Sequence, residues 1–331
     1  MKHKVARLAA VTGIVLLLAA VTVAVAGILR ARMLLYGALD GRRERVQTQE
    51  SVTRFELLAE TAQSQVRPRI SGWLSVIEPQ TVTLMTDRGE LYARTYGALD
   101  GAEDAPWALV FHGGPGSSGE QVQDIACELS LAGYRVVTPD LYAHGESAGQ
   151  ITTLGGAETE DVLAWVEWIM GADASAQIVL MGQDEGALAV LMAAAQGMPG
   201  AVKAVATDSA YPDAALRARA LMRENGFSEE GLDMMLLRTA YQAINGVPLE
   251  SGLFERLSDV EVPLLVMHGT GDQDVPAWHS EDIALAVGEN AELYYVEGAG
   301  HGMARYVDPK GYYGALIGFF DRATQHRTDI P

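Results

Sequence analysis

The chain of 331 residues contains a single cysteine and no motif for holding a metal or a nucleoside phosphate. One cysteine excludes an internal disulfide and a cysteine-based zinc site. No G-x-x-x-x-G-K-[S/T] loop occurs and no histidine–glutamate pair has metal-ligand spacing, so we expect neither a metal nor another cofactor. Basic residues are also scarce, because 24 Lys and Arg against 43 Asp and Glu give a net charge of −19. Nucleic acid is therefore excluded as a partner, since binding phosphates requires clustered basic side chains.

The few basic residues are concentrated at one end of the chain. Residues 1–70 carry 11 basic and 5 acidic residues, whereas residues 71–331 carry 13 and 38. A hydrophobic content of 49% is normal for a folded protein and argues against disorder. The length suits one large domain or two modest ones, and it is enough to bury a full core.

Charged residues are missing entirely from Leu8–Leu29. A helix of this length, at about 1.5 Å per residue, would cross the hydrocarbon core of a bilayer, which is roughly 30 Å thick. Basic residues flank the run on both sides: Lys2, Lys4, Arg7, Arg30 and Arg32. Residues 1–32 are predicted to form a transmembrane anchor. The alternative is a cleaved signal peptide, with Ala24-Val25-Ala26 as its cleavage site.

The side of the membrane stays open. Three basic residues precede the apolar run and five follow it, and this asymmetry weakly favours a cytoplasmic domain. The positive charge of the free amino terminus reduces this difference in basic charge between the two flanks. If the segment is instead a cleaved signal peptide, the protein is secreted. Residues 33–71 are interpreted as a juxtamembrane linker. Near the membrane, the basic residues within 30–54 could attract anionic lipid.

From residue 72 onwards, short apolar segments alternate with segments of helical periodicity. Strands are predicted over residues 81–85, 91–96, 107–111, 135–138, 177–181, 202–206, 264–267 and 292–296. Helices are predicted over residues 121–131, 158–170, 187–195, 280–287 and 310–323. Such alternation indicates βαβ units and a parallel sheet covered on both faces. Residues 210–260 interrupt it with a helical insertion, which we interpret as a lid over a site.

Four loops at the ends of predicted strands carry residues suited to catalysis. Strand 107–111 runs into the glycine-rich loop 112–119, whose backbone N–H groups could bind an oxyanion. Gly182-Gln183-Asp184-Glu185-Gly186 joins a strand to a helix, and its glycines permit a tight turn that presents Asp184. Asp272 and His301 follow the strands 264–267 and 292–296.

These loops, together with Gly133–Val137 and His144–Ser147, resemble the α/β-hydrolase fold. The details are most similar to bacterial α/β-hydrolases with an N-terminal membrane segment, related to serine aminopeptidase-like hydrolases. The resemblance implies a mostly parallel, doubly wound sheet with a helical lid. It also implies a catalytic triad in the order nucleophile, acid and histidine, and backbone oxyanion donors. The implied residues are Asp184, Asp272 and His301 for the triad and Gly114 and Glu185 for the oxyanion donors.

Aspartate occupies the position where most relatives have serine. A carboxylate is ionised near neutral pH, so it needs no base to attack a saturated carbon and form an alkyl ester. His301, oriented by Asp272, would then activate water to hydrolyse that ester. Epoxide hydrolases and haloalkane dehalogenases of this fold use such an aspartate, and the His112-Gly113-x-Pro115 loop resembles that of epoxide hydrolases.

The resemblance favours a small, apolar, epoxide-like substrate over a haloalkane. Haloalkane dehalogenases have a tryptophan after the nucleophile to hold the halide, whereas this chain has the anionic Glu185. Epoxide hydrolases use lid tyrosines to protonate the opening ring, and Tyr211 and Tyr241 are the candidates here.

Other interpretations remain. Asp184 could be a degenerate serine position in a relative of ester or peptide hydrolases that binds or regulates without turnover, or the chain could be a non-catalytic envelope protein. Asp274 competes with Asp272 as the triad acid, and the spacing to Val275-Pro276 favours Asp272. His112 and His144 are expected to hold turns by hydrogen bonds. The sequence does not indicate an oligomeric state.

Overall fold

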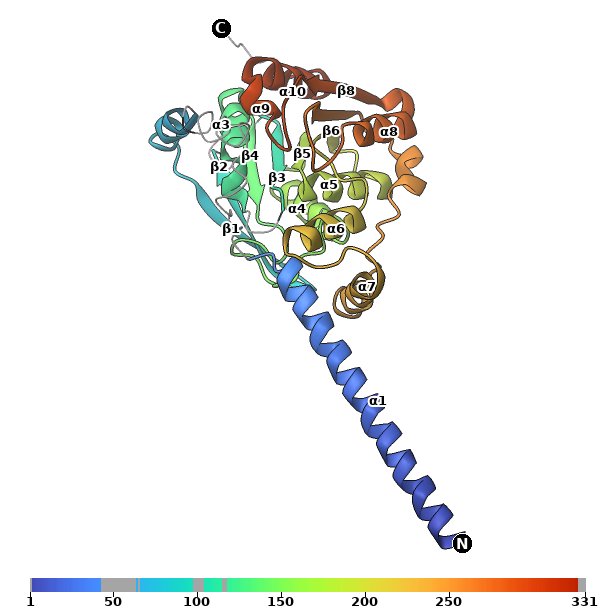
Figure 1. Cartoon of the computed structure of the whole chain (residues 1–331). Coiled ribbons are helices and arrows are strands. Elements are labelled where there is room, and N and C mark those ends of the chain that lie inside the picture. The colour runs from blue at the N-terminus through green and yellow to red at the C-terminus, as the bar shows by residue number, and fades with distance from the viewer. Residues whose placement is uncertain (1, 43–63, 65, 98–103, 115–117, 327–331) are drawn as a thin grey trace.

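The computed structural model describes residues 2–42, 64, 66–97, 104–114 and 118–326. A long helix, α1 (Lys2–Ala38), projects from a domain in which helices surround a sheet (Figure 1). The strands are β1 (Gln80–Thr86), β2 (Gly89–Tyr96), β3 (Trp107–Phe111), β4 (Arg135–Pro139), β5 (Ile178–Gln183), β6 (Val202–Asp208), β7 (Leu264–Gly269) and β8 (Ala291–Val296). Each predicted strand is present.

The eight strands form one sheet in the order β1-β2-β4-β3-β5-β6-β7-β8. Pairing is antiparallel from β1 to β2 and from β2 to β4, and parallel across the rest. All residues of β3 and β5 are buried, because helices cover both faces of the central strands. The sheet is mostly parallel, as the sequence predicts.

The main helices are α3 (Gln123–Leu131), α4 (Thr159–Ala172), α5 (Glu185–Gln196), α6 (Ala214–Glu224), α7 (Gly231–Asn245), α8 (Trp278–Val287), α9 (Ala304–Val307) and α10 (Pro309–Thr324). Short 3-10 turns are η1 (Gly119–Val122), η2 (Phe254–Asp259) and η3 (Gly288–Asn290). Alternate side chains of β3 enter two separate cores. Leu109 and Phe111 pack with α4, α5 and α8, while Ala108 and Val110 pack with α3 and α10.

Helix α1 extends further than the predicted anchor of residues 1–32. It continues through Arg30 and Arg32, because arginine is a good helix former whose charge need not end a helix. Its last turns, with Leu34 and Leu35, are buried in the core next to the lid. Residues 66–74 are also helical, so helices occupy both ends of the predicted linker 33–71. Residues 43–63 of that linker lie outside the described residues.

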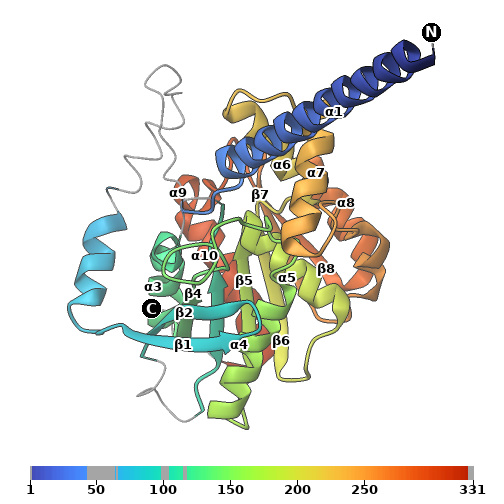
Figure 2. The ribbon, with the colours of Figure 1, turned by 90° about the horizontal axis from the view of Figure 1, so that it is seen from below.

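The predicted lid over residues 210–260 consists of α6, α7 and η2. It lies between β6 and β7 in the chain and contacts the end of α1 (Figure 2). Among the residues that the structure describes, one helix is long and apolar enough to cross a membrane, Thr12–Ala38.

Candidate active site

Asp184 stands in the sharp turn between β5 and α5. Its backbone has φ 54° and ψ −112°, a region that residues with a side chain rarely adopt. A Cβ at Gly186 would lie 2.5 Å from the His112 carbonyl oxygen, and one at Gly182 would lie 2.7 Å from the Ala187 nitrogen. Glycine is therefore required on both sides of the turn. The backbone N–H of Asp184 donates to the Asp208 carbonyl at 3.0 Å, which ties the turn to the end of β6.

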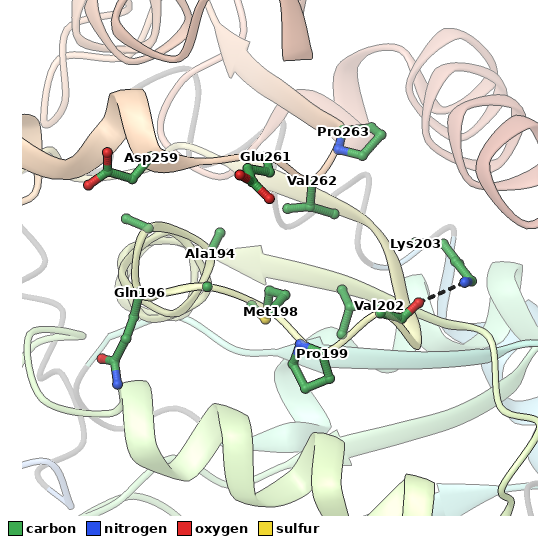
Figure 3. Close-up of a pocket in the computed structure, with 13 residues that line it drawn as sticks. Ala194, Gln196, Met198, Pro199, Val202, Lys203, Asp259, Glu261, Val262 and Pro263 are labelled. Atoms are coloured by element: carbon green, nitrogen blue, oxygen red, sulfur yellow. Dashed lines mark hydrogen bonds between the residues drawn. The ribbon is translucent and has the colours of Figure 1, made fainter.

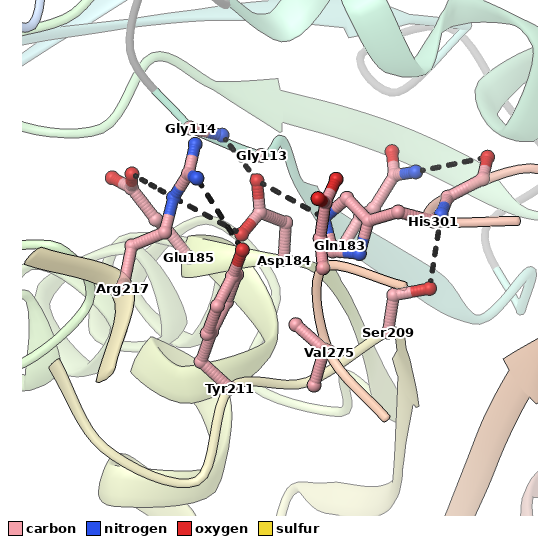
Figure 4. A network of polar contacts seen from close by, with 12 residues as sticks. Gly113, Gly114, Gln183, Asp184, Glu185, Ser209, Tyr211, Arg217, Val275 and His301 are labelled. Carbon is pink, nitrogen blue, oxygen red and sulfur yellow. Dashed lines mark hydrogen bonds and ion pairs between the residues drawn. The ribbon is translucent and has the colours of Figure 1, made fainter. Parts of the chain in front are cut away.

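The fold brings Asp184, Asp272 and His301 together. His301 Nδ1 lies 2.8 Å from Asp272 Oδ2, and His301 Nε2 lies 3.7 Å from Asp184 Oδ2 (Figure 4). The three residues follow the carboxyl ends of β5, β7 and β8. Strands β7 and β8 are adjacent, and only β6 lies between β5 and β7. The imidazole thus connects a buried carboxylate with the carboxylate in the strained turn.

Asp272 is a buried and fully hydrogen-bonded carboxylate. Its Oδ1 accepts the backbone N–H groups of Asp274 and Val275 at 2.9 and 2.8 Å. Its Oδ2 lies 3.1 Å from His268 Nε2. Burial opposes ionisation, but hydrogen bonds from His268 and His301 outweigh it and hold the pKa of Asp272 at about 2. Asp274 is exposed, so of the two aspartates it is Asp272 that is buried against His301.

His301 carries a proton at neutral pH. Burial lowers its pKa, but the contacts of its two ring nitrogens with the carboxylates of Asp184 and Asp272 outweigh burial and raise the pKa to about 10. The loop that carries His301 is held through Gly302, whose N–H donates to Ser209 Oγ at 3.1 Å. The carbonyl of Gly302 accepts Arg305 Nη1 at 3.0 Å and Gln183 Nε2 at 3.4 Å.

Gly114, one of the two predicted oxyanion donors, is a backbone donor to the Asp184 carboxylate. Its N–H donates to Asp184 Oδ2 at 3.0 Å. The preceding N–H, of Gly113, donates to Gln121 Oε1 at 3.1 Å. The other predicted donor, Glu185, follows Asp184 as the first residue of α5. Residues 115–117 of the glycine-rich loop lie outside the described residues.

The side chain of Glu185 has a partner that sequence reasoning missed. Arg217 reaches from α6 of the lid and is buried, with Nε 3.4 Å from Glu185 Oε1 and 3.8 Å from Asp184 Oδ1. Glu185 Oε2 also accepts the Thr152 hydroxyl at 3.1 Å. Burial, followed by the charge of Asp184, raises the pKa of Glu185 to about 8 against the opposing charge of Arg217. Much of the negative charge expected at Glu185 is therefore neutralised.

The two lid tyrosines differ in their surroundings. The Tyr211 hydroxyl points toward Asp184 and accepts Arg217 Nη1 at 3.3 Å (Figure 4). Its ring packs edge-on against His301, with centroids 5.6 Å apart. Tyr241 is also buried, but its hydroxyl donates to the Thr153 carbonyl at 2.9 Å. Tyr211 is thus the tyrosine that the fold directs to the carboxylate.

His112 and His144 both hold backbone turns. His112 Nδ1 donates to the Gly113 carbonyl at 2.8 Å, and its Nε2 accepts the Leu141 N–H at 3.0 Å. Burial and the neighbouring His144 lower the pKa of His112 to about 3, which agrees with a neutral ring. His144 Nδ1 donates to the Tyr142 carbonyl at 2.9 Å.

A cavity of about 640 Å³ lies at the other end of α5 (Figure 3). It is lined by Ala194–Gly200, Val202, Lys203, Asp259 and Glu261–Pro263. Helix α5 has 12 residues and is therefore about 18 Å long, which separates this cavity from Asp184. The amine of Lys203 at its rim already donates to the Gly200 carbonyl. No cluster of three or more metal-ligating side chains occurs among the described residues.

Comparisons with known proteins agree on the architecture. Residues 106–230 match the family model described as the alpha/beta hydrolase fold. An esterase of Pyrococcus furiosus is 20% identical over 75% of this chain and 93% of its own, with a TM-score of 0.59. A membrane phospholipase A, described as a bacterial virulence factor, is 17% identical over 82% and 94%, with a TM-score of 0.55. No protein of the curated set matches the sequence. This chain thus has the α/β-hydrolase fold, as its motifs predict.

Proposed function

We propose that this chain of α/β-hydrolase fold is a membrane-anchored hydrolase in which Asp184 attacks a small apolar electrophile, such as an epoxide. One observation carries the proposal. A carboxylate occupies the strained turn after β5, its Oδ2 accepts a backbone N–H, and a complete His301–Asp272 pair stands beside it. The match of residues 106–230 to the hydrolase family model supports the reaction class.

The first step forms a covalent ester. Gly114 holds Oδ2, so Oδ1 is the oxygen that attacks a ring carbon of the epoxide while the carbon–oxygen bond of the ring breaks. The alkoxide formed by ring opening takes a proton from the Tyr211 hydroxyl. Arg217, which donates to that hydroxyl oxygen, stabilises the negative charge left on Tyr211. The His301 imidazolium then returns a proton to Tyr211.

Formation of the ester prepares His301 for the second step. Esterification removes the negative charge of Asp184, which is one of the two charges that keep His301 protonated. The neutral imidazole can then take a proton from water, and the hydroxide attacks Cγ of Asp184. Gly114 donates to the oxyanion that develops on Oδ2.

Collapse of this intermediate breaks the ester bond and closes the cycle. The alcohol oxygen leaves with the proton held by His301, and Asp184 is released as a carboxylic acid whose proton passes to His301. The free site therefore returns to carboxylate and imidazolium, and the net reaction is epoxide plus water to diol. One oxygen of the Asp184 carboxylate now comes from water.

The membrane anchor is part of the proposal. Apolar side chains between Ile14 and Leu29 are 49–71% exposed and point in several directions around α1. A helical segment that is apolar on all sides and exposed along its length requires a nonpolar environment, which a bilayer provides.

Trapping the ester tests the reaction. His301→Gln should still be alkylated but should not hydrolyse the ester, so a screen of epoxides, haloalkanes and lactones should give a stable mass adduct on the peptide that contains Asp184. The same screen with His326→Gln is the matched control, because His326 lies near the end of the described chain and binds the Ala132 carbonyl. That variant should turn over without accumulating an adduct.

Labelled water provides an independent test. A turnover in H₂¹⁸O should place ¹⁸O in the Asp184 peptide, because the water attacks Cγ rather than the substrate. Absence of both the adduct and the label, across all three substrate classes, would exclude the nucleophilic role of Asp184.

A second candidate is binding without turnover, and the contact between Arg217 and Asp184 favours it, since a counter-ion weakens a nucleophile. Under this alternative Asp184 is a degenerate serine position. Asp184→Ser would then create activity toward p-nitrophenyl esters in a chain whose parent is inert toward every substrate class.

A further inference from the structure

The lid is joined directly to the membrane helix. Arg30 of α1 forms a two-point ion pair with Asp233 of α7, with Nε 2.9 Å from Oδ1. The guanidinium carbon of Arg30 also lies 5.3 Å from the ring centre of Phe227, between α6 and α7. One turn further along α1, Leu34 is fully buried in the core that the lid shares. Figure 2 shows α1 running over α6 and beside α7.

The ion pair sets the height of α7 relative to a bilayer. Arg30 is the first charged residue after the charge-free run Leu8–Leu29. In a spanning helix such an arginine lies at the boundary between acyl chains and headgroups. Asp233, in the first turn of α7, must therefore lie at the same boundary.

The free surface of α7 suits that position. Leu232 is 63% exposed and Met235 is 55% exposed, and they flank Asp233. They share one helix face with the exposed residues Thr239 and Ala243, because residues three and four apart lie above one another. The residues of α7 that are exposed as a whole are uncharged: Gly231, Leu232, Met235, Thr239, Gln242, Ala243 and Ile244. The side chain of Arg238, 42% exposed, borders them, and its charge is paired with Glu250. Such a surface is unusual in a domain with so large an excess of acidic residues.

We propose that this α7 face, Leu232, Met235, Thr239 and Ala243, rests in the headgroup layer of the membrane that α1 crosses. The inference rests on the proposed anchor. A helix with one apolar, uncharged face lies in the plane of that layer with its apolar side chains toward the acyl chains. Because α6 of the same lid carries Arg217 to Asp184, the lid then lies between the site and the bilayer.

Fluorescence quenching in vesicles measures the depth of this face. The chain has one cysteine, Cys127, which is 1% exposed, so an introduced cysteine can be labelled selectively. We would label Met235→Cys in the full chain and reconstitute it in phosphatidylcholine vesicles containing lipid brominated near the headgroup or near the chain end. Leu18→Cys, within the apolar run, reports on the anchor, and Leu285→Cys, 81% exposed on α8, is the matched surface control.

The expected result is a loss of fluorescence at residue 235 that is larger with shallow bromine than with deep bromine. Residue 18 should be quenched more strongly by the deep bromine, and residue 285 by neither. Quenching at residue 18 without quenching at residue 235 would overturn the docking of α7 but leave the anchor intact. If residue 18 is not quenched, the anchor and the inference fall together. The same labelled proteins are also exposed to iodide, a quencher dissolved in the water. If residue 235 is protected from iodide but is not quenched by brominated lipid, a second copy of the chain covers this face, and the proposal is overturned.

Discussion

Replacing Asp184 by asparagine should release the proton that the free site keeps on His301. The substitution preserves the shape of the side chain but removes the charge 3.7 Å from His301 Nε2. At an effective dielectric constant of about 20, unit charges at that separation interact by roughly 4 kcal/mol, equivalent to a change of about 3 in pKa. Since Asp272 remains, the pKa of His301 should fall from about 10 to roughly 7.

Nuclear magnetic resonance of histidine-labelled protein measures this pKa directly. The His301 signal is assigned by its absence in His301→Gln, and Asp274→Asn serves as the control, because that aspartate is exposed. The parent should hold its imidazolium signal through neutral pH, whereas Asp184→Asn should titrate near neutrality. A pKa of His301 that stays near 10 in Asp184→Asn would refute the reasoning. It would also remove the physical basis for His301 acting as a base once Asp184 is esterified.

Three further outcomes are expected. Arg217→Met should lower the free energy of unfolding in urea by about 3–5 kcal/mol, because it leaves buried carboxylates without their counter-ion. Arg223→Met, at a side chain 67% exposed, should change it by less than about 0.5 kcal/mol. Asp272→Asn should slow steady-state turnover by about 10²–10⁴-fold, whereas Asp274→Asn should not change it. The raised pKa of His301 stabilises the fold fully below the unfolded value of about 6.5, so stability should fall as pH rises toward 10. Urea titrations across that range should show a much weaker decline in His301→Gln.

Elements whose features are local were predictable. The central strands of the sheet are short runs of apolar residues. A strand that is buried on both faces is apolar at nearly every position, so the sequence reveals it directly. The turn at Asp184 was predictable for a related reason. Its glycines are required by contacts within a few residues, including the close approach of Gly182 to Gly186 and Ala187.

Features that depend on contacts between distant segments were not predictable. Arg217 lies 33 residues beyond Asp184 in an arginine-containing helix, and nothing in the sequence distinguishes it from the exposed Arg223 of the same helix. The difference arises only when α6 packs over the strand ends. The burial of Leu34 was unpredictable for the same reason, since the helical periodicity of residues 30–38 does not say that Leu34 has a core to enter.

The sequence by itself determined the sheet, the glycine-flanked turn and the apolar run, because each depends on residue types within a short window. Tertiary structure decided which charges meet. It placed Arg217 against Asp184 and Glu185, directed Tyr211 rather than Tyr241 toward the carboxylate, and joined Arg30 to Asp233. The physical reason is that an ion pair depends on distance in space, and only the folded chain sets the distance between residues far apart in sequence.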